Sequence, residues 1–199
     1  MKIIGITGGV GAGKSQVLDY LHMQYGACIC KADEMGKKVQ RKGTPCFQQI
    51  VEYFGEDIVK WNGELNREKL AQLVFSDEKK LQALNEMVHP AVQKEIDELI
   101  ESERQKDTKL FILETAILIG SCYESMCDEI WYIYVTEENR KNRLMYARGY
   151  SAEKIENIFR AQMTKQEFLR SCDRVVDNNG LFEETTHQLD VILRELLED

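Results

Sequence analysis

Short apolar runs without polar alternation recur along the chain. They cover residues 3–6, 27–30, 110–113, 130–135 and 175–176. Runs of this length with apolar residues at successive positions are typical of strands that are buried on both faces, as in parallel sheets. The pattern therefore predicts five strands in one parallel sheet.

Helical periodicity fills several intervals between these runs. Residues 14–25, 137–147 and 181–197 read as helices, and the last range has apolar residues at helical spacing. Strands that alternate with helices indicate an α/β fold, in which helices flank a mostly parallel sheet.

Residues 34–106 break this alternation, because they read as one helix after another with no convincing strand. We interpret them as an inserted helical lobe. Proline at a first helical position and polar capping side chains predict where its helices begin. The expected caps and first residues are Pro45, Asn66, Ser76 and Pro90.

The composition narrows the class of protein. A chain of 199 residues fits one domain that carries an inserted lobe. The 26 basic and 34 acidic residues give a net charge of -8, which repels polyanions, so we expect no nucleic-acid partner. The six cysteines form no C-x-x-C pair, which favours reduced thiols in a cytoplasmic protein. The longest apolar stretch, residues 110–120, is too short to span a bilayer, so we expect no membrane segment.

The segment GGVGAGKS carries the clearest chemical signal. It fits the pattern G-x-x-x-x-G-K-[ST] through Gly8, Gly13, Lys14 and Ser15, and it joins a predicted strand to a predicted helix. In such a loop, backbone N–H groups and the helix N-terminus attract phosphate oxygens, the lysine reaches the β- and γ-phosphates, and the serine hydroxyl binds Mg²⁺. The segment therefore predicts a site for Mg²⁺ and ATP.

Two acidic residues follow predicted strands, at the edge where doubly wound sheets bind their ligands. Glu114 follows residues 110–113, and it either holds a metal-bound water or is a capping or solvated acid. Asp33 follows residues 27–30, and it either accepts the proton of an acceptor hydroxyl or caps a helix. Spacing leaves both alternatives open for each residue.

Arginines gather in the second half of the chain, at positions 140, 143, 148 and 160. Arg140 and Arg143 lie three residues apart and so share a helix face. Cations placed there would neutralise the charge that spreads over a phosphoryl group during transfer. The alternative is a solvated basic helix face.

Over essentially its whole length, the sequence resembles the dephospho-coenzyme A kinase family. Beyond the loop GITGGVGAGKS, the resemblance rests on the segments ADEMGKKV, GELNREKLAQLVFSD, LNEMVHPAV, RLMYARGYS and DRVVDNNG. It implies that ATP phosphorylates the ribose 3′-hydroxyl of dephospho-coenzyme A to give coenzyme A and ADP, the last step of coenzyme A biosynthesis. Dephospho-coenzyme A and ATP would then be the small-molecule partners of the protein.

The resemblance also implies a domain organisation. It implies a P-loop kinase fold with a five-stranded parallel sheet, in which residues 1–33 and 107–199 form the nucleotide-binding core. Residues 34–106 would form the helical lobe for dephospho-coenzyme A, and residues 137–170 a lid. A monomer and a small homo-oligomer are both compatible with these patterns.

Roles for single residues follow from the same resemblance. Asp33 matches the acid that orients or deprotonates the 3′-hydroxyl, and His89 matches a motif of the substrate lobe. We expect Asp33, His89 and Glu114 to bind the acceptor, and Lys14, Arg140 and Arg143 to act in catalysis with Asp33. The residues expected to bind ATP are Gly8, Gly9, Val10, Gly11, Ala12, Gly13, Lys14, Ser15, Gln16, Asp177 and Asn178, with Ser15 as the Mg²⁺ ligand.

The sequence departs from the family pattern near both acids. Lys31 stands where the family usually has aspartate, and in ETAILIG the residues Glu114, Ala116 and Gly120 replace aspartate, proline and glutamate. Because alternate residues of a strand share a face, we expect Lys31 to lie beside Asp33, where it would lower the pKa of that carboxylate or contact a substrate phosphate. Two alternative functions stay open: a kinase for another small hydroxyl acceptor, and a nucleotide-binding protein without turnover.

Overall fold

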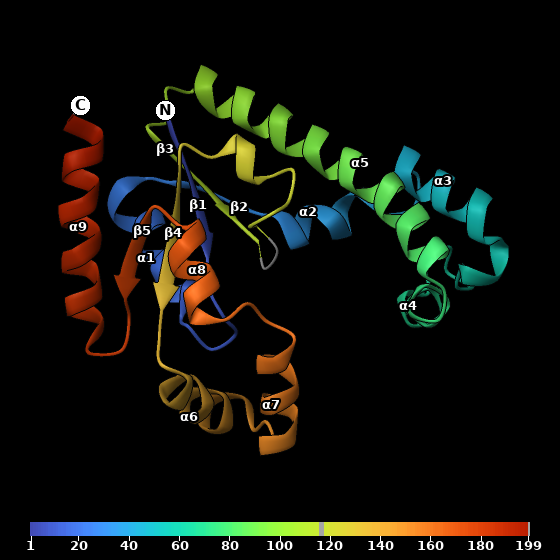
Figure 1. The fold of residues 1–199 in the computed structure, drawn as a ribbon. Coiled ribbons are helices and arrows are strands. Elements are labelled where there is room, and N and C mark those ends of the chain that lie inside the picture. Colours follow the sequence, from blue (N-terminus) through green and yellow to red (C-terminus); the bar gives the residue numbers. More distant parts are fainter. Residues whose placement is uncertain (116–117, 199) are drawn as a thin grey trace. The chain divides into compact units, whose positions relative to one another are not determined.

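The computed structural model describes residues 1–115 and 118–198 (Figure 1). The chain forms two compact units, Met1–Cys30 with Glu103–Asp199, and Lys31–Ser102. We call the first the core unit and the second the helical unit. Ala116, one of the departures from the family pattern, lies outside the described residues.

A five-stranded parallel sheet forms the centre of the core unit, as the apolar runs predict. The strand order is β2-β3-β1-β4-β5, so two of the four neighbouring pairs, β3-β1 and β1-β4, are not consecutive in the chain. Parallel strands are joined by crossover connections, as in other α/β folds. The predicted fold class is confirmed. The strands are β1 (Lys2–Thr7), β2 (Cys28–Lys31), β3 (Leu110–Glu114), β4 (Glu129–Tyr134) and β5 (Arg174–Asp177).

Helices cover both faces of this sheet (Figure 1). Leu21 of α1 and Leu193 of α9 are fully buried in one apolar cluster with Ile6 and Ile133 of the sheet. On the opposite face, Phe168 of α8 stacks on Tyr132 of β4 with ring centroids 4.5 Å apart. The α-helices that lie wholly in the core unit are α1 (Lys14–Tyr25), α6 (Glu137–Arg148), α7 (Ala152–Arg160), α8 (Lys165–Ser171) and α9 (Phe182–Glu198).

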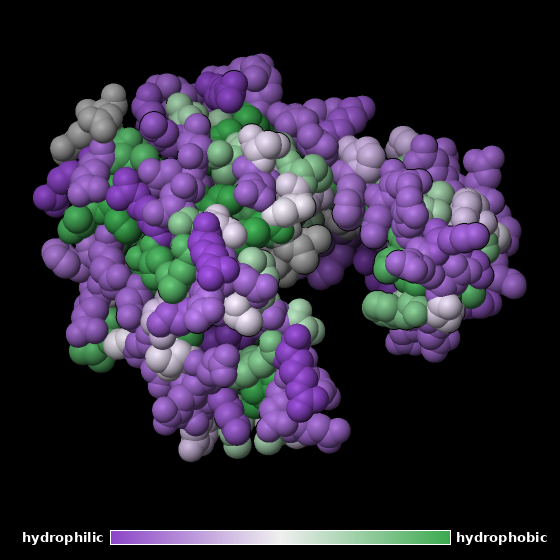
Figure 2. Space-filling view, in the orientation of Figure 1, coloured by the Kyte–Doolittle hydropathy of each residue, from purple (hydrophilic) through white to green (hydrophobic). Residues whose placement is uncertain are grey.

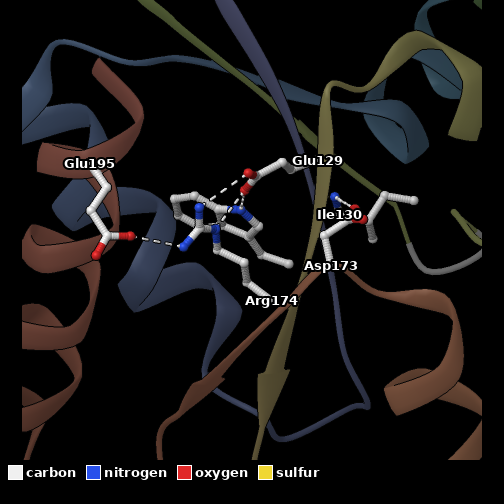
Figure 3. Close-up of polar contacts among 6 residues, drawn as sticks. Glu129, Ile130, Asp173, Arg174 and Glu195 are labelled. Atoms are coloured by element: carbon white, nitrogen blue, oxygen red, sulfur yellow. Dashed lines mark hydrogen bonds and ion pairs between the residues drawn. The ribbon is translucent and has the colours of Figure 1, made fainter. Parts of the chain in front are cut away.

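A charged network joins β4, β5 and α9 (Figure 3). Arg174 donates hydrogen bonds to both carboxylate oxygens of Glu129, at 2.9 and 3.3 Å, and to Glu195 at 3.2 Å. Trp131 Nε1 donates to Glu129 at 2.8 Å, and Asp173 accepts a backbone N–H of β4 at 2.7 Å. The first two residues of the family-like segment DRVVDNNG therefore attach β5 to its neighbours.

The helical unit follows the prediction of successive helices. Apart from one isolated bridge between Val59 and Leu65, its residues 31–102 contain no strand pairing beyond the end of β2. Its interior includes the buried side chains of Ile50, Leu70 and Ile96. The elements are α2 (Ala32–Val39), α3 (Pro45–Phe54), the 3-10 turn η1 (Glu56–Ile58), α4 (Arg67–Phe75) and α5 (Glu78–Gln105).

Two of the predicted helix starts are confirmed and two are wrong. Pro45 is the first residue of α3, and Asn66 caps α4 by accepting the Lys69 N–H at 3.2 Å. Ser76 instead ends α4. The residue after it, Asp77, accepts N–H groups of the first turn of α5 at 3.0 and 3.3 Å, so the cap was predicted one position too early.

Pro90 lies inside α5 and does not begin it. Proline in a helix interior lacks an N–H donor and costs about 3 kcal/mol. Val92, Ile96 and Ile100 are buried at a spacing of four residues on one side of this helix. Because burial of each such side chain stabilises the fold by about 1.5–3 kcal/mol, packing outweighs the local preference to break the helix at Pro90.

Hydrophilic residues make up most of the face drawn in Figure 2, and apolar residues appear among them in places. Trp61 is the most exposed large apolar side chain, at 100%. Among the described residues, no helix has both the length and the apolar character that crossing a membrane requires.

Candidate functional site

Residues 8–13 form a tight loop between β1 and α1. Gly8 and Gly13 have φ angles of 149° and 83°, which side chains rarely allow. A Cβ at Gly13 would lie 2.4 Å from Asn178 Nδ2, and one at Gly8 would lie 2.7 Å from the Ile133 carbonyl oxygen. Glycine is therefore required at both positions by backbone conformation and by close neighbours.

Backbone donors of this loop fit a phosphate group. The N–H groups of Gly11, Gly13 and Ser15 have no acceptor in the described part of the chain. Ser15 is exposed in the first turn of α1, where the helix N-terminus favours anions. An exposed hydroxyl beside a phosphate site also fits a Mg²⁺ ligand. The described residues include no group of three or more His, Cys, Asp or Glu that could hold a metal ion.

Lys14 and Glu114, which were predicted independently, lie together. Lys14 Nζ donates to the Gly8 carbonyl oxygen at 2.8 Å and lies 3.6 Å from Glu114 Oε1. The two side chains are only 15% and 16% exposed. Glu114 ends β3, which pairs with β1, and its register partner is Ile6, just before the loop. The strand order thus places this carboxylate beside the loop lysine.

Arg140 contacts the loop from α6. Its side chain is 7% exposed, and Nε donates to the Val10 carbonyl oxygen at 2.9 Å. The guanidinium group also donates to Gln162 Oε1 and lies 4.3 Å from the centre of the Phe159 ring. Burial lowers the pKa of Arg140. The alternative of a solvated basic face is therefore wrong for this residue.

Asn178 connects the loop to the segment after β5. Its Nδ2 donates to the Ala12 carbonyl oxygen at 2.8 Å, and its Oδ1 accepts from Thr185 at 2.8 Å. Its own carbonyl oxygen accepts from the Arg143 guanidinium at 2.7 Å. Asn178 and Arg143 thus lie at the loop, where both contact protein groups. Their expected roles in binding ATP and in catalysis stay predictions. Asp177 is exposed, and its carboxylate accepts a hydrogen bond from the backbone N–H of Asn179 at 2.8 Å.

Gln162 and Asn179 also take part in this site, although they were not among the predicted site residues. Gln162 lies between α7 and α8, and its Oε1 accepts from both Arg140 and the Val10 N–H, the latter at 3.3 Å. Asn179 Oδ1 accepts the backbone N–H of the residue before α6 at 2.8 Å. Asn179 could have been suspected from its place in DNNG, whereas nothing in the local sequence marks Gln162.

The region predicted as a lid contains α6, α7 and α8. Of these, α6 contacts the loop through Arg140, and α8 packs on β4 through Phe168. Thr164 and Glu167 form a capping box at the start of α8. Movement of this region stays a prediction.

Asp33 lies in the helical unit, in the first turn of α2. Lys31 is the N-cap residue of that helix, so the alternative that Asp33 is the cap is wrong. The expectation that both residues share one face of a strand is also wrong, because the strand ends at Lys31. Lys31 Nζ lies 3.6 Å from Glu34 Oε1 instead. The Asp33 side chain is exposed.

His89 also belongs to the helical unit. It is half-buried in α5 and lines an open cavity of about 550 Å³, together with Glu78, Glu86 and Pro90. The predicted site residues are therefore divided, with Asp33 and His89 in the helical unit and all others in the core unit.

Comparisons with known proteins point to one family. A family model described as dephospho-CoA kinase matches residues 2–184. A dephospho-CoA kinase of Aquifex aeolicus is 37% identical over 199 residues, which cover 100% of both chains.

Solved structures share the fold. The structure of dephospho-CoA kinase from Campylobacter jejuni matches with a TM-score of 0.72 and 19% identity, over 100% of this chain and 98% of that one. Shikimate kinase from Acinetobacter baumannii, in complex with shikimate, matches with a TM-score of 0.54 and 14% identity, over 98% and 94% of the two chains. At these identities the likeness shows the fold alone, which is that of P-loop kinases.

Proposed function

The chain belongs to the dephospho-CoA kinase family, and we propose that it transfers the γ-phosphoryl group of ATP to the ribose 3′-hydroxyl of dephospho-coenzyme A. The products are coenzyme A and ADP, and the reaction is the last step of coenzyme A biosynthesis. The observation that best supports this proposal is the loop itself, where Lys14 lies between Gly8 and Glu114 beside backbone donors that suit phosphate oxygens.

Phosphoryl transfer requires little from the protein beyond position and charge. The N–H groups of residues 11–15 would bind the β- and γ-phosphates, and Lys14 would stabilise the charge on the oxygens of the transferred group. Ser15 would hold Mg²⁺, which when bound neutralises negative charge between the two phosphates. Glu114 would orient Lys14 and accept a hydrogen bond from a metal-bound water.

Asp33 would orient the 3′-hydroxyl and accept its proton. Its exposed carboxylate, at the start of α2, is open to an incoming substrate. A correctly placed general base contributes roughly 10²- to 10⁴-fold to a rate. His89, on α5 of the same unit, would contact another part of the acceptor.

Arg140 and Arg143 would stabilise the transition state from the nucleotide side. Arg140 already binds the Val10 carbonyl oxygen within the phosphate loop. Arg143 binds the Asn178 carbonyl oxygen, near the segment that would lie beside the ATP base. The two side chains differ in exposure: Arg140 is buried, and Arg143 is half-buried.

Each of the two compact units would bind one of the two substrates. The core unit would bind ATP through the loop and through Asp177 and Asn178. The helical unit would bind dephospho-coenzyme A, and residues 137–170 would close over the nucleotide and exclude water, which is a rival nucleophile. We further propose a cytoplasmic monomer or small homo-oligomer that has no nucleic-acid partner.

The test is a coupled assay for ADP with dephospho-coenzyme A as acceptor, run beside nucleosides and other small alcohols. We expect ADP release to depend on dephospho-coenzyme A and to be slow without an acceptor. If the enzyme prefers a different alcohol, the proposed acceptor is wrong. If no acceptor increases the release of ADP, the proposed kinase activity is wrong. Asp33→Asn should lower kcat about 10²- to 10⁴-fold while KM for ATP stays the same; a near-normal rate would remove only the role of Asp33.

A further inference from the structure

A strongly basic pocket lies in the helical unit. Its volume is about 420 Å³, and its charged lining consists of five cations and the single carboxylate of Glu64. Such a concentration of positive charge stands out in a chain whose net charge is -8. The cations are Lys37, Arg41, Lys42, Lys60 and Arg67.

These cations lack the carboxylate partners that other lysines of the unit have. Lys38 pairs with Glu95 at 2.5 Å, and Lys69 lies 3.9 Å from Asp57. Within the described residues, none of the five pocket cations forms an ion pair. Glu64 accepts a hydrogen bond from Asn62 at 3.1 Å. Because like charges around one cavity repel each other, a bound anion would stabilise this arrangement.

The backbone around the pocket also favours an anion. Arg67 is the first residue of α4, a helix of nine residues, so the pocket adjoins a helix N-terminus and its partial positive charge. The Arg67 guanidinium donates to the Lys37 carbonyl oxygen at 3.4 Å, near the end of α2. That contact places the Arg67 guanidinium at the junction of the two helices.

We propose that this pocket binds the diphosphate group of the acceptor, an inference that rests on the proposed function. Two linked phosphoryl groups offer several anionic oxygens to several cations, which a single carboxylate cannot do. Because the diphosphate is attached to the ribose that carries the reacting hydroxyl, its binding would position that hydroxyl.

The placement of Asp33 agrees with this assignment. Lys37 follows Asp33 by four residues on α2, so the two share a helix face with Cβ atoms about 6 Å apart. In dephospho-coenzyme A, one ribose carries both the 3′-hydroxyl and, through its 5′ carbon, the diphosphate. A diphosphate bound at Lys37 therefore leaves the 3′-hydroxyl within about one helical turn, next to the proposed base.

The kinetic test uses the double variant Arg41→Gln/Lys42→Gln. Both residues are exposed and follow the end of α2, so their replacement should leave the fold intact. We expect KM for dephospho-coenzyme A to rise about 100-fold, or about tenfold for each cation lost, while KM for ATP stays within about twofold. The matched control, Lys79→Gln/Lys94→Gln, removes two exposed lysines of the same unit from outside the pocket and should leave both KM values unchanged.

Binding is measured separately from turnover, with inorganic pyrophosphate as the probe. Trp61 is fully exposed and follows the pocket residue Lys60, whereas Trp131 is buried in the sheet, so fluorescence of Trp61 reports on the pocket. The titration is done in a Lys14→Met background to suppress binding at the loop. We expect the fluorescence of Trp61 to change with pyrophosphate concentration until it saturates. The affinity for pyrophosphate should fall about 100-fold in Arg41→Gln/Lys42→Gln, and the fluorescence change should be absent in Trp61→Phe.

The outcomes separate this inference from the proposed function. If the wild type phosphorylates dephospho-coenzyme A but the pocket variant keeps its acceptor KM, the pocket assignment alone fails. An equal rise in the control variant, or a rise in KM for ATP instead, also overturns it. If there is no acceptor-dependent turnover, the proposed function fails, and the pyrophosphate titration still decides whether the pocket binds a diphosphate.

Discussion

Lys14 Nζ lies 3.6 Å from Glu114 Oε1 and 2.8 Å from the Gly8 carbonyl oxygen, so the loop lysine is fixed between the end of β3 and the start of its own loop. Both side chains are largely buried, which strengthens their attraction relative to a surface pair. The ammonium group is therefore oriented by the fold and needs little rearrangement to meet a phosphate.

Lys14→Met should lower kcat about 10²- to 10³-fold, because it removes a fixed charge from the site where negative charge develops. The coupled ADP assay measures this effect. Glu114→Gln is the companion variant, and we expect it to raise the Mg²⁺ concentration for half-maximal rate while Lys14 remains in place. A Lys14→Met enzyme with normal kcat would contradict the role of this lysine in transfer.

Arg140→Met should lower the free energy of unfolding by about 2–3 kcal/mol and lower kcat, since the side chain is proposed to stabilise the transition state. It leaves the Val10 carbonyl oxygen and Gln162 Oε1 without their buried donor, and lost hydrogen bonds to a charged group have this magnitude. Urea denaturation and initial rates measure the two effects. Arg148→Met is the control, since Arg148 is exposed at the end of the same helix and should tolerate the change.

Glu129→Gln should destabilise the protein by about 1–2 kcal/mol at neutral pH, through its contacts with Arg174 and Trp131. Burial raises the pKa of Glu129, but the hydrogen bonds from Arg174 and Trp131 outweigh burial and leave the pKa below its ordinary value of 4.5. A carboxyl group whose pKa falls on folding stabilises the native state above that ordinary value and loses the contribution as pH falls through the folded pKa.

The difference in unfolding free energy between wild type and Glu129→Gln should therefore be constant from about pH 6 to 7 and shrink below about pH 4.5. Urea denaturation at several pH values measures it. A gap that stays the same at pH 3.5 would mean that the loss comes from packing and not from the charge of Glu129.

Pro90→Ala should stabilise the protein by about 1–2 kcal/mol, because alanine restores an N–H donor inside α5. The gain stays below the full helix penalty of proline, since alanine also gives the unfolded chain more freedom. Thermal denaturation measures the shift. Pro45→Ala is the matched control: Pro45 stands at the start of α3, where proline is favourable, so this variant should be neutral or less stable.

The sheet and the loop were predictable because their signals are local. Each strand contains a run of apolar residues, and the glycines, Lys14 and Ser15 occupy fixed positions between a strand and a helix. The helix starts at Pro45 and Asn66 were predictable for the same reason. By contrast, the course of α5 through Pro90 depends on buried residues on the far side of that proline, so packing overrides the local rule.

The surroundings of the loop could be predicted only in part. The positions of Arg140 and Asn178 were suspected, but not that Arg140 is buried against Phe159 or that Gln162 bridges it to Val10. The contact between Gln162 and Val10 joins residues 152 positions apart, and the contacts of Arg140 with Phe159 and Gln162 depend on how α6 packs against the chain around α7. Neither kind of contact produces a periodic pattern in the sequence. The prediction for Lys31 was wrong because β2 ends at this residue and α2 follows. Lys31 and Asp33 therefore do not share one face of a strand.

The hydrogen bond from Asn178 to the Ala12 carbonyl oxygen joins residues 166 positions apart. The loop gains this contact only after β5 has paired with β4, because Asn178 follows β5 directly. When the protein refolds from urea, affinity for ATP should therefore return only in the phase in which β5 joins the sheet.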